Sequence, residues 1–167
     1  MIDIRVEKIT LNIGTSKDEE KLKRGLKLLQ KLTPLTPVKT STKRRIPALG
    51  LRPGLVVGCT VTIRKDAEPL LKRLLAAREY TLPVRSFDHN GNFSFGVPEY
   101  IDVQGLEYDP ELKIMGLEVA VTLERPGYRV KVRKIHPQTI GKHHHISPAE
   151  AIAFAQEKLG VKIEGVE

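Results

Sequence analysis

The chain has little of several residue types that would mark other classes of protein. It has one cysteine, no tryptophan and only 5% aromatic residues. The single Cys59 excludes an internal disulfide and suits a reducing compartment. The scarcity of aromatic rings argues against base stacking as the main mode of nucleic-acid binding.

Long apolar runs are also missing. No stretch reaches the roughly 18 apolar residues that a membrane-spanning helix needs. The first ten residues, MIDIRVEKIT, contain acids and alternate in character, so they do not read as a signal peptide. We therefore expect a cytoplasmic protein with no membrane partner.

Acidic residues are absent from two stretches of the chain. Residues 37–65 contain seven Lys or Arg, and residues 125–149 contain six more together with four of the five His. The two stretches carry +13 while the whole chain carries +8, so the remainder sums to −5. A solvated charged surface is the ordinary alternative, but residues 37–65 have no acids with which to form local pairs. Such concentrated charge is typical of a surface that binds a polyanion.

Alternating apolar and polar residues predict several strands. One covers residues 2–13, where a change of phase at Glu7–Lys8 suggests a bulge. Residues 117–123 and the extended start of residues 36–45 predict two more, and shorter strands are expected at 100–103 and 128–133. In the last of these, Arg129, Lys131 and Arg133 would form a fully cationic outer face.

The strand predicted over residues 55–64 separates its side chains most clearly. Its core face is expected to consist of Val57, Cys59, Val61 and Ile63. Its outer face is expected to consist of Gly58, Thr60, Thr62 and Arg64. Because Cys59 falls on the core face, it is expected to pack in the interior and not to act as a nucleophile.

Three helices are predicted from their start and stop signals. Ser16 and Glu19 form a capping-box pattern for the first, which ends at Thr33-Pro34. Asp66 is expected to cap the second, whose core positions are Leu70, Leu71, Leu74 and Leu75. The sequence SPAE at 147–150 begins the third, Ile152, Ala155 and Leu159 form its buried stripe, and Gly160 ends it.

Together these elements predict an α+β fold in one domain over residues 1–167. We expect an antiparallel sheet of about five strands with helices packed on one face and a basic, RNA-facing opposite face. Residues 43–54 should form a projecting loop, since Pro47, Gly50, Pro53 and Gly54 prevent regular pairing. Residues 140–167 should form a C-terminal helical extension.

Other candidate sites are weaker. Consecutive His143 to His145 point in different directions, so at most two could bind one metal ion, and a basic lead-in to a helix that lies near phosphate is favoured. We expect no metal and no other cofactor. No arrangement of acid, base and nucleophile is visible, and we expect no enzymatic activity. Phe87, Phe93 and Phe95 could stack on bases or pack as ordinary strand residues, and both interpretations stay open.

Several longer motifs resemble a known family. They are RVEKITLNIG (5–14), TSTKRRIPALGLRPG (40–54), GCTVTIR (58–64) and SFDHNGNFSFGV (86–97), followed by ERPGYRV (124–130) and IGKHHHISPAEAIAFAQEKLGVKI (140–163). The chain resembles the universal large-subunit ribosomal protein family that binds 5S rRNA, the fifth in bacterial naming and the eleventh in eukaryotic naming. The last two motifs resemble its archaeal and eukaryotic branch, which has a C-terminal extension that the bacterial form lacks. The resemblance to that branch also implies a chain that starts directly at its first strand, without the bacterial N-terminal helix.

The resemblance implies a structural component of the large ribosomal subunit. It would bind 5S rRNA, help to form the central protuberance with 23S rRNA and neighbouring ribosomal proteins, and contact P-site tRNA through the projecting loop. The alternative is a free regulatory module that binds RNA or protein off the ribosome. Co-sedimentation with ribosomes distinguishes the two.

The expected contact residues fall into three groups. Those for 5S rRNA are Asn12, Lys39, Thr60, Thr62, Arg64 and Lys65, of which Asn12, Thr62 and Arg64 match the motifs of the family. Those for tRNA are Lys43, Arg44, Arg45, Ile46, Pro47, Leu49 and Arg52. Those for other rRNA are Arg129, Lys131, Arg133, Lys142 and His143.

Overall fold

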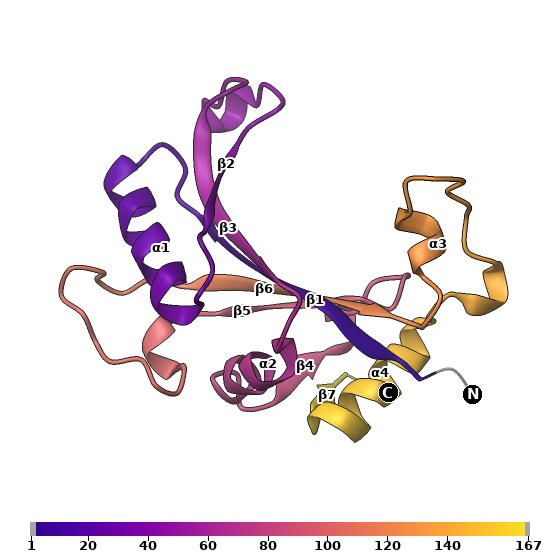
Figure 1. The fold of residues 1–167 in the computed structure, drawn as a ribbon. Coiled ribbons are helices and arrows are strands. Elements are labelled where there is room, and N and C mark those ends of the chain that lie inside the picture. Colours follow the sequence, from indigo (N-terminus) through magenta and orange to yellow (C-terminus); the bar gives the residue numbers. More distant parts are fainter. Residues whose placement is uncertain (1–2, 166–167) are drawn as a thin grey trace. The chain divides into compact units, whose positions relative to one another are not determined.

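A computed structural model describes residues 3–165 and confirms the predicted α+β fold. Five strands form an antiparallel sheet in the order β2-β3-β1-β6-β5 (Figure 1). The strands are β1 (Arg5–Gly14), β2 (Val38–Ser41), β3 (Val56–Ile63), β5 (Phe93–Val97) and β6 (Leu117–Glu124). The helices are α1 (Glu19–Leu32), α2 (Ala67–Ala76), α3 (Arg129–Val132) and α4 (Pro148–Leu159). The predicted start of the first strand at Ile2 lies outside the described residues.

A second, two-stranded sheet was not predicted. In it, β4 (Thr81–Pro83) pairs in parallel with β7 (Lys162–Glu164). Strands of three residues are too short to show a hydrophobic period, so no sequence signal marked them. No helix among residues 3–165 is both long and apolar enough to cross a membrane.

The chain divides into two compact units. The hairpin unit contains residues 10–63 and 96–119 and includes the β2–β3 hairpin, while the terminal unit contains the residues up to 9, 64–95 and those from 120 onward. The expected single domain over residues 1–167 stays a prediction.

The core of the hairpin unit lies between α1 and one face of β1 and β3. Leu11 and Ile13 of β1 and Cys59 and Val61 of β3 are buried, as the alternation predicted. At Gly25 of α1, an added Cβ would lie 3.0 Å from Cys59 Sγ and 3.4 Å from Ile13 Cγ2. Glycine therefore lets the helix approach the strands closely, although it is a poor helix former.

The first helix begins two residues later than the predicted cap. Asp18 is the N-cap, and its carboxylate accepts hydrogen bonds from the backbone N–H of Glu20 and Lys21. The capping box predicted from Ser16 and Glu19 is wrong, since Ser16 has a left-handed backbone (φ 54°) in the preceding turn. The predicted end is confirmed, because α1 stops at Leu32 and Thr33 is its C-cap.

The terminal unit has its own core. Leu70, Leu71, Leu74 and Leu75 of α2 are buried as predicted. Asp66 does occupy the N-cap position of α2, but its side chain makes no capping hydrogen bond. In α4 the buried stripe consists of Ala151, Phe154, Ala155 and Leu159, whereas the predicted Ile152 is half-buried.

The start of α4 has the predicted signals. Ser147 is the N-cap, Pro148 stands at the first turn, and Ser147 and Glu150 form a reciprocal capping box. Glu150 Oε1 also accepts a hydrogen bond from Arg125 Nη2 at 2.6 Å. The backbone N–H of Ser147 and then Arg125 lower the pKa of the Glu150 carboxyl below its usual 4.5.

Two predicted strands are wrong. Tyr100–Asp102 is a 3₁₀ turn followed by Val103, and Tyr100 and Val103 are both buried. Residues 129–132 form the single helical turn α3, in which Val132 is 78% exposed. Alternation alone does not make residues 128–133 a strand. A strand also needs a neighbouring strand for its backbone hydrogen bonds, and neither sheet of the described residues includes this segment.

Gly25→Val should destabilise the protein, because the added side chain overpacks the contact of α1 with Cys59 and Ile13. We expect a loss of about 1–3 kcal/mol in the free energy of unfolding, measured by urea denaturation. Lys23→Val, at an exposed position of the same helix, is the control and should cost less than about 0.7 kcal/mol. Equal effects of the two substitutions would mean that the packing is not tight.

Glu150→Gln should lower stability at neutral pH and have little effect in acid. The pKa of Glu150 is lower in the folded chain than its usual value, so the contribution of the carboxylate is fully present above 4.5 and is lost as the pH falls through the folded value. Thermal unfolding should show a loss of at most about 0.5 kcal/mol near pH 7, because solvent screens this exposed carboxylate, and the loss should shrink toward about pH 3. A loss that does not depend on pH would contradict this assignment.

Candidate functional site

The outer face of the strands in the hairpin unit is made of small and polar groups. Thr60 and Thr62 of β3 are half-buried and Asn12 of β1 is exposed, all on the face away from α1. Next to Asn12 lies a shallow hollow of about 310 Å³ that Gly96 and Glu118 also line. Within the described strands of this unit, Glu118 is the single charged side chain on this face. Its surface is therefore polar, and the cations lie on other parts of the chain.

The register of β2 against β3 shows which face of the sheet Lys39 occupies. Lys39 lies opposite Cys59, whereas Val38 and Thr40 lie opposite Thr60 and Gly58. Directly opposed residues share a face, so the exposed Lys39 belongs to the face of Cys59 and not to that of Thr60. Thr40, which sequence reasoning missed, is on the polar face. Counting the pairing outward from the hairpin could have identified it.

Gly58 allows this surface to be flat. An added Cβ at Gly58 would lie 2.6 Å from the Ile13 carbonyl oxygen and 3.1 Å from the Thr40 hydroxyl. Thr40, Gly58 and the backbone of β1 are therefore in close contact. No larger side chain fits between them, which leaves the main chain of the strands close to the surface.

The two threonine hydroxyls of β3 differ. Thr60 Oγ1 donates a 2.9 Å hydrogen bond to the backbone carbonyl of Leu11 on the neighbouring strand. Thr62 makes no such bond in the described structure. Arg64 and Lys65 follow β3 directly, are exposed, and are the first residues of the terminal unit after the hairpin unit.

The predicted loop at 43–54 is the end of a long hairpin (Figure 1). We call residues 43–54 the arm. Backbone bonds continue beyond β2 and β3, from Thr42 N–H to Leu55 O at 2.9 Å and from Gly54 N–H to Thr42 O at 2.8 Å. Ile46 and Leu51 then exchange two bonds of 3.0 Å. Beyond them the tip closes through the 3₁₀ turn Pro47–Leu49 and the left-handed Gly50.

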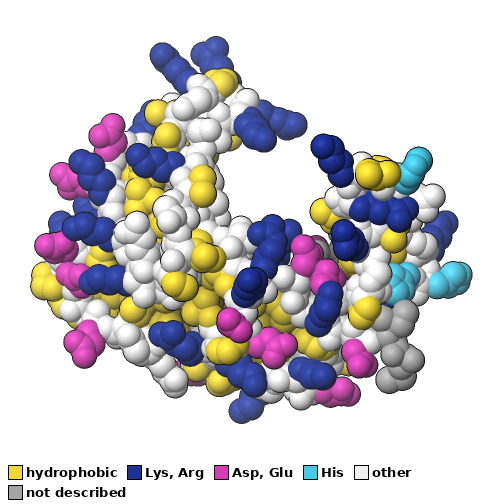
Figure 2. Space-filling view, viewed as in Figure 1, with side chains coloured by type: hydrophobic (Ala, Val, Ile, Leu, Met, Phe, Trp, Pro, Cys, Tyr) yellow, Lys and Arg dark blue, Asp and Glu magenta, His cyan; other side chains and the backbone are white. Residues whose placement is uncertain are grey.

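The cations of the arm are exposed. Lys43, Arg44, Arg45 and Arg52 form no ion pair within residues 3–165, and Figure 2 shows Lys and Arg side chains around the tip. Leu49 is also exposed, while Leu51 is buried. Lys17, from the turn before α1, reaches the tip, since its Nζ lies 2.5 Å from the Cβ position of Gly50. No sequence signal pointed to this additional cation.

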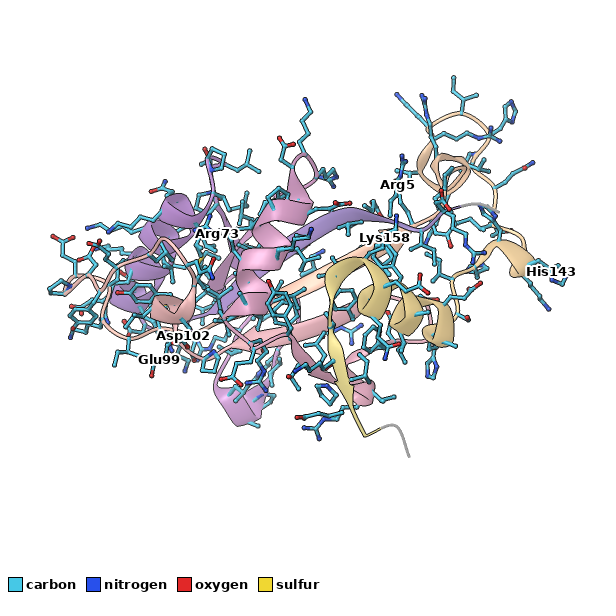
Figure 3. The ribbon with its side chains drawn as sticks, turned by 90° about the horizontal axis from the view of Figure 1, so that it is seen from below. Arg5, Arg73, Glu99, Asp102, His143 and Lys158 are labelled. Carbon is cyan, nitrogen blue, oxygen red and sulfur yellow. The ribbon has the colours of Figure 1, made fainter. Side chains whose placement is uncertain are left out.

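Most of the second cationic stretch, residues 125–146, folds as a segment of short turns in the terminal unit. We call it the segment 125–146. Arg129, Lys131, Arg133, Lys142 and His143 are all exposed. Tyr128 Oη donates to the His144 carbonyl at 3.1 Å, and the His144 ring lies 3.0 Å from the Pro126 carbonyl. His143 projects outward (Figure 3). These contacts hold the segment together without a strand.

The remaining candidates have structural roles. Cys59 is buried, and burial raises the pKa of its thiol to about 11, so the thiol is protonated at neutral pH. Phe93 and Phe95 are buried, and the rings of Phe87 and Phe93 pack 5.3 Å apart. Phe93 and Phe95 therefore pack in the core. Within residues 3–165 no three His, Cys, Asp or Glu side chains are grouped as metal ligands would be.

Known proteins are similar to this chain over nearly its whole length. The family described as the C-terminus of the ribosomal L5 proteins matches residues 56–154. Three relatives, each named "Large ribosomal subunit protein uL5", come from Nanoarchaeum equitans, Picrophilus torridus and Sulfurisphaera tokodaii. In that order, their identities to this chain are 47%, 41% and 42%. The matches cover 98%, 99% and 98% of this chain. They cover 97%, 95% and 93% of the relatives' own lengths.

These matches confirm the resemblance found in the sequence motifs. They agree with a polar strand face and an exposed cationic arm. The chain belongs to the uL5 family of large ribosomal subunit proteins, which are structural and not enzymes.

Proposed function

We propose that this chain binds 5S rRNA in the large ribosomal subunit through the polar face of β1, β2 and β3. The observation that carries the proposal is the flat row formed by Asn12, Thr60 and Thr62, which Arg64 and Lys65 follow in the chain. Short polar side chains can reach the 2′-hydroxyls of RNA, and the cations neutralise its phosphates. Lys39 would contribute from the edge of the sheet.

The three hydroxyl and amide groups have different capacities. The hydrogen of Thr60 is already donated to Leu11, so Thr60 can only accept a bond from RNA. Thr62 can donate or accept, and the amide of Asn12 can do both at once. The face therefore offers a fixed pattern of polar groups on a rigid support.

The arm is proposed to contact a different RNA, the P-site tRNA. Its cations are Lys43, Arg44, Arg45 and Arg52, and Ile46, Pro47 and Leu49 form the apolar part of the tip. Because the arm extends beyond the strands of the sheet (Figure 1), its tip can bind one partner while the strand face holds another. A tip with cations and exposed aliphatic side chains suits a backbone and sugar surface.

The segment 125–146 is proposed to contact 23S rRNA, through Arg129, Lys131, Arg133, Lys142 and His143. With 5S rRNA on the strand face and 23S rRNA on this segment, the chain would help to form the central protuberance beside neighbouring ribosomal proteins. The support is the concentration of positive charge in the two acid-free stretches.

Arg64→Ala and Asn12→Ala should weaken the binding of 5S rRNA, measured by filter-binding titration against salt. Arg64→Ala removes a phosphate contact, so binding should weaken and the salt slope should fall by about 1. Asn12→Ala should weaken binding roughly tenfold. Arg78→Ala and Gln30→Ala remove the same groups from exposed positions outside this face and are the controls. Wild-type affinity in both Arg64→Ala and Asn12→Ala, or a salt slope near zero, would show that the face is assigned wrongly.

Replacing Lys43, Arg44, Arg45 and Arg52 together by Gln should separate the two roles. Binding of 5S rRNA should change by less than about fivefold, because these side chains lie beyond the strand face. The occupancy of P-site tRNA on large subunits that carry the variant should fall by about tenfold or more. Deletion of residues 45–54 should act in the same direction. A large loss of 5S rRNA affinity would contradict this division between face and arm.

A further inference from the structure

The terminal unit contains a cavity that the proposed contacts do not use. Its volume is about 490 Å³, and it lies between strand residues and the 125–146 segment. Thr122 of β6, Asn90 of the preceding turn, and Tyr128 and Ile140 of the segment line it. This volume is in the range of pockets that hold small organic groups.

The cavity is built by hydrogen bonds and is not only a gap beside a loop. Tyr128 Oη donates to the His144 carbonyl, and Arg125 binds Glu150 at the start of α4. Asn92, another lining residue, accepts a 3.2 Å bond from the Leu123 N–H and donates to Asp88 at 3.0 Å. Both walls are therefore fixed before any ligand arrives, which lowers the entropic cost of binding.

The charges at the cavity leave a net positive rim. Arg5 binds Glu124 at 2.6 Å and Lys8 lies 3.6 Å from Glu7, so these four charges compensate one another. Arg5 is labelled in Figure 3, on the strand end beside this segment. Arg129 and Lys131 also line the cavity and form no ion pair within residues 3–165. A ligand with an anionic group is therefore favoured at the rim.

We propose that this cavity receives one unpaired nucleotide of a bound RNA strand, with the base inside and its phosphate on Arg129 and Lys131. The lining offers what a base needs, namely a ring and an aliphatic side chain in Tyr128 and Ile140, and a hydroxyl and an amide in Thr122 and Asn90. The inference rests on the proposed function only in that the chain binds ribosomal RNA. The positive rim favours an anion, and the confined cavity fits a single base better than an extended acidic peptide.

The direct test is a titration of the full chain with the four nucleoside 5′-monophosphates, followed by amide NMR shifts. At least one should shift the amides of Asn90, Asn92 and Tyr128 in a saturable way. Its affinity should exceed that of ribose 5-phosphate by roughly tenfold, because the base makes contacts of its own. Equal affinity for ribose 5-phosphate or inorganic phosphate would overturn the proposal, and so would the absence of shifts at these amides.

A matched pair of variants locates the effect. Val132 and Ile135 are both exposed aliphatic residues of the same segment, 78% and 74% exposed, but only Val132 lines the cavity. Val132→Glu should weaken nucleotide binding by about tenfold through repulsion of the phosphate, and Ile135→Glu by less than about twofold. Equal losses would mean a general electrostatic effect and would overturn the proposal.

Two further measurements separate the possible failures. A hexaglutamate peptide that shifts the same amides as tightly as the best nucleotide would identify an acidic-peptide site and overturn the proposal. Filter binding of 5S rRNA tests the proposed function independently, because Val132→Glu leaves the strand face unchanged. If the wild-type chain binds 5S rRNA but no nucleotide at these amides, the cavity alone is refuted. If it binds a nucleotide there but not 5S rRNA, only the strand-face assignment is refuted.

Discussion

The constraint on which the hairpin unit depends is the close packing of α1 on alternate side chains of β1 and β3. A Cβ added at Gly25 would lie 3.0 Å from Cys59 Sγ and 3.4 Å from Ile13 Cγ2, and both of these strand residues are buried under the helix. Because side chains alternate along a strand, the other face is free for a partner. Small residues such as Gly58 and Thr60 can occupy it without loss of core packing. The rigidity of the proposed binding face is thus a result of what is buried behind it.

Ion pairing decides where free positive charge remains. On α1, Lys27 binds Glu111 at 2.7 Å and Lys31 binds Asp109, and the hydrogen bond from Lys31 lowers the pKa of Asp109. In the terminal unit Arg125 is held by Glu150 in the same way. Acids of other elements therefore neutralise these three cations, while the arm and the segment 125–146 contain no acid of their own. Exposed pairs of this kind add little stability, but they remove competing sites for a polyanion.

Long elements could be predicted from the sequence because each carried a full hydrophobic period. The core faces of β3 and β6, the leucines of α2 and the capping box of α4 follow directly from residue spacing. Residues 128–133 also alternate, but three valine and tyrosine positions without a strand partner cannot define a sheet, and they form the turn of α3 instead. Whether Lys39 or Thr40 lies on the polar face depends on one residue of register. The register follows from the pairing of β2 with β3 and cannot be read from either strand alone. The hydrogen bond of Thr60 to Leu11 joins residues 49 positions apart, so no local pattern could show it.

The backbone pairing below the tip of the arm restricts how the sequence of the hairpin can vary. Backbone bonds run from β2 and β3 to the Ile46–Leu51 bridge, so the direction of each cation below the tip is set by the pairing inside the sheet. Adding two residues to each strand of the hairpin preserves these directions. A single residue added to one strand turns the side chains that follow it to the opposite surface. The turn at residues 47–50 is free of that restriction. Sequence change in this family can therefore lengthen or reshape the tip gradually. A residue added to only one of the paired strands would have to be absorbed by a bulge, such as the register shift already present between Thr40 and Ser41.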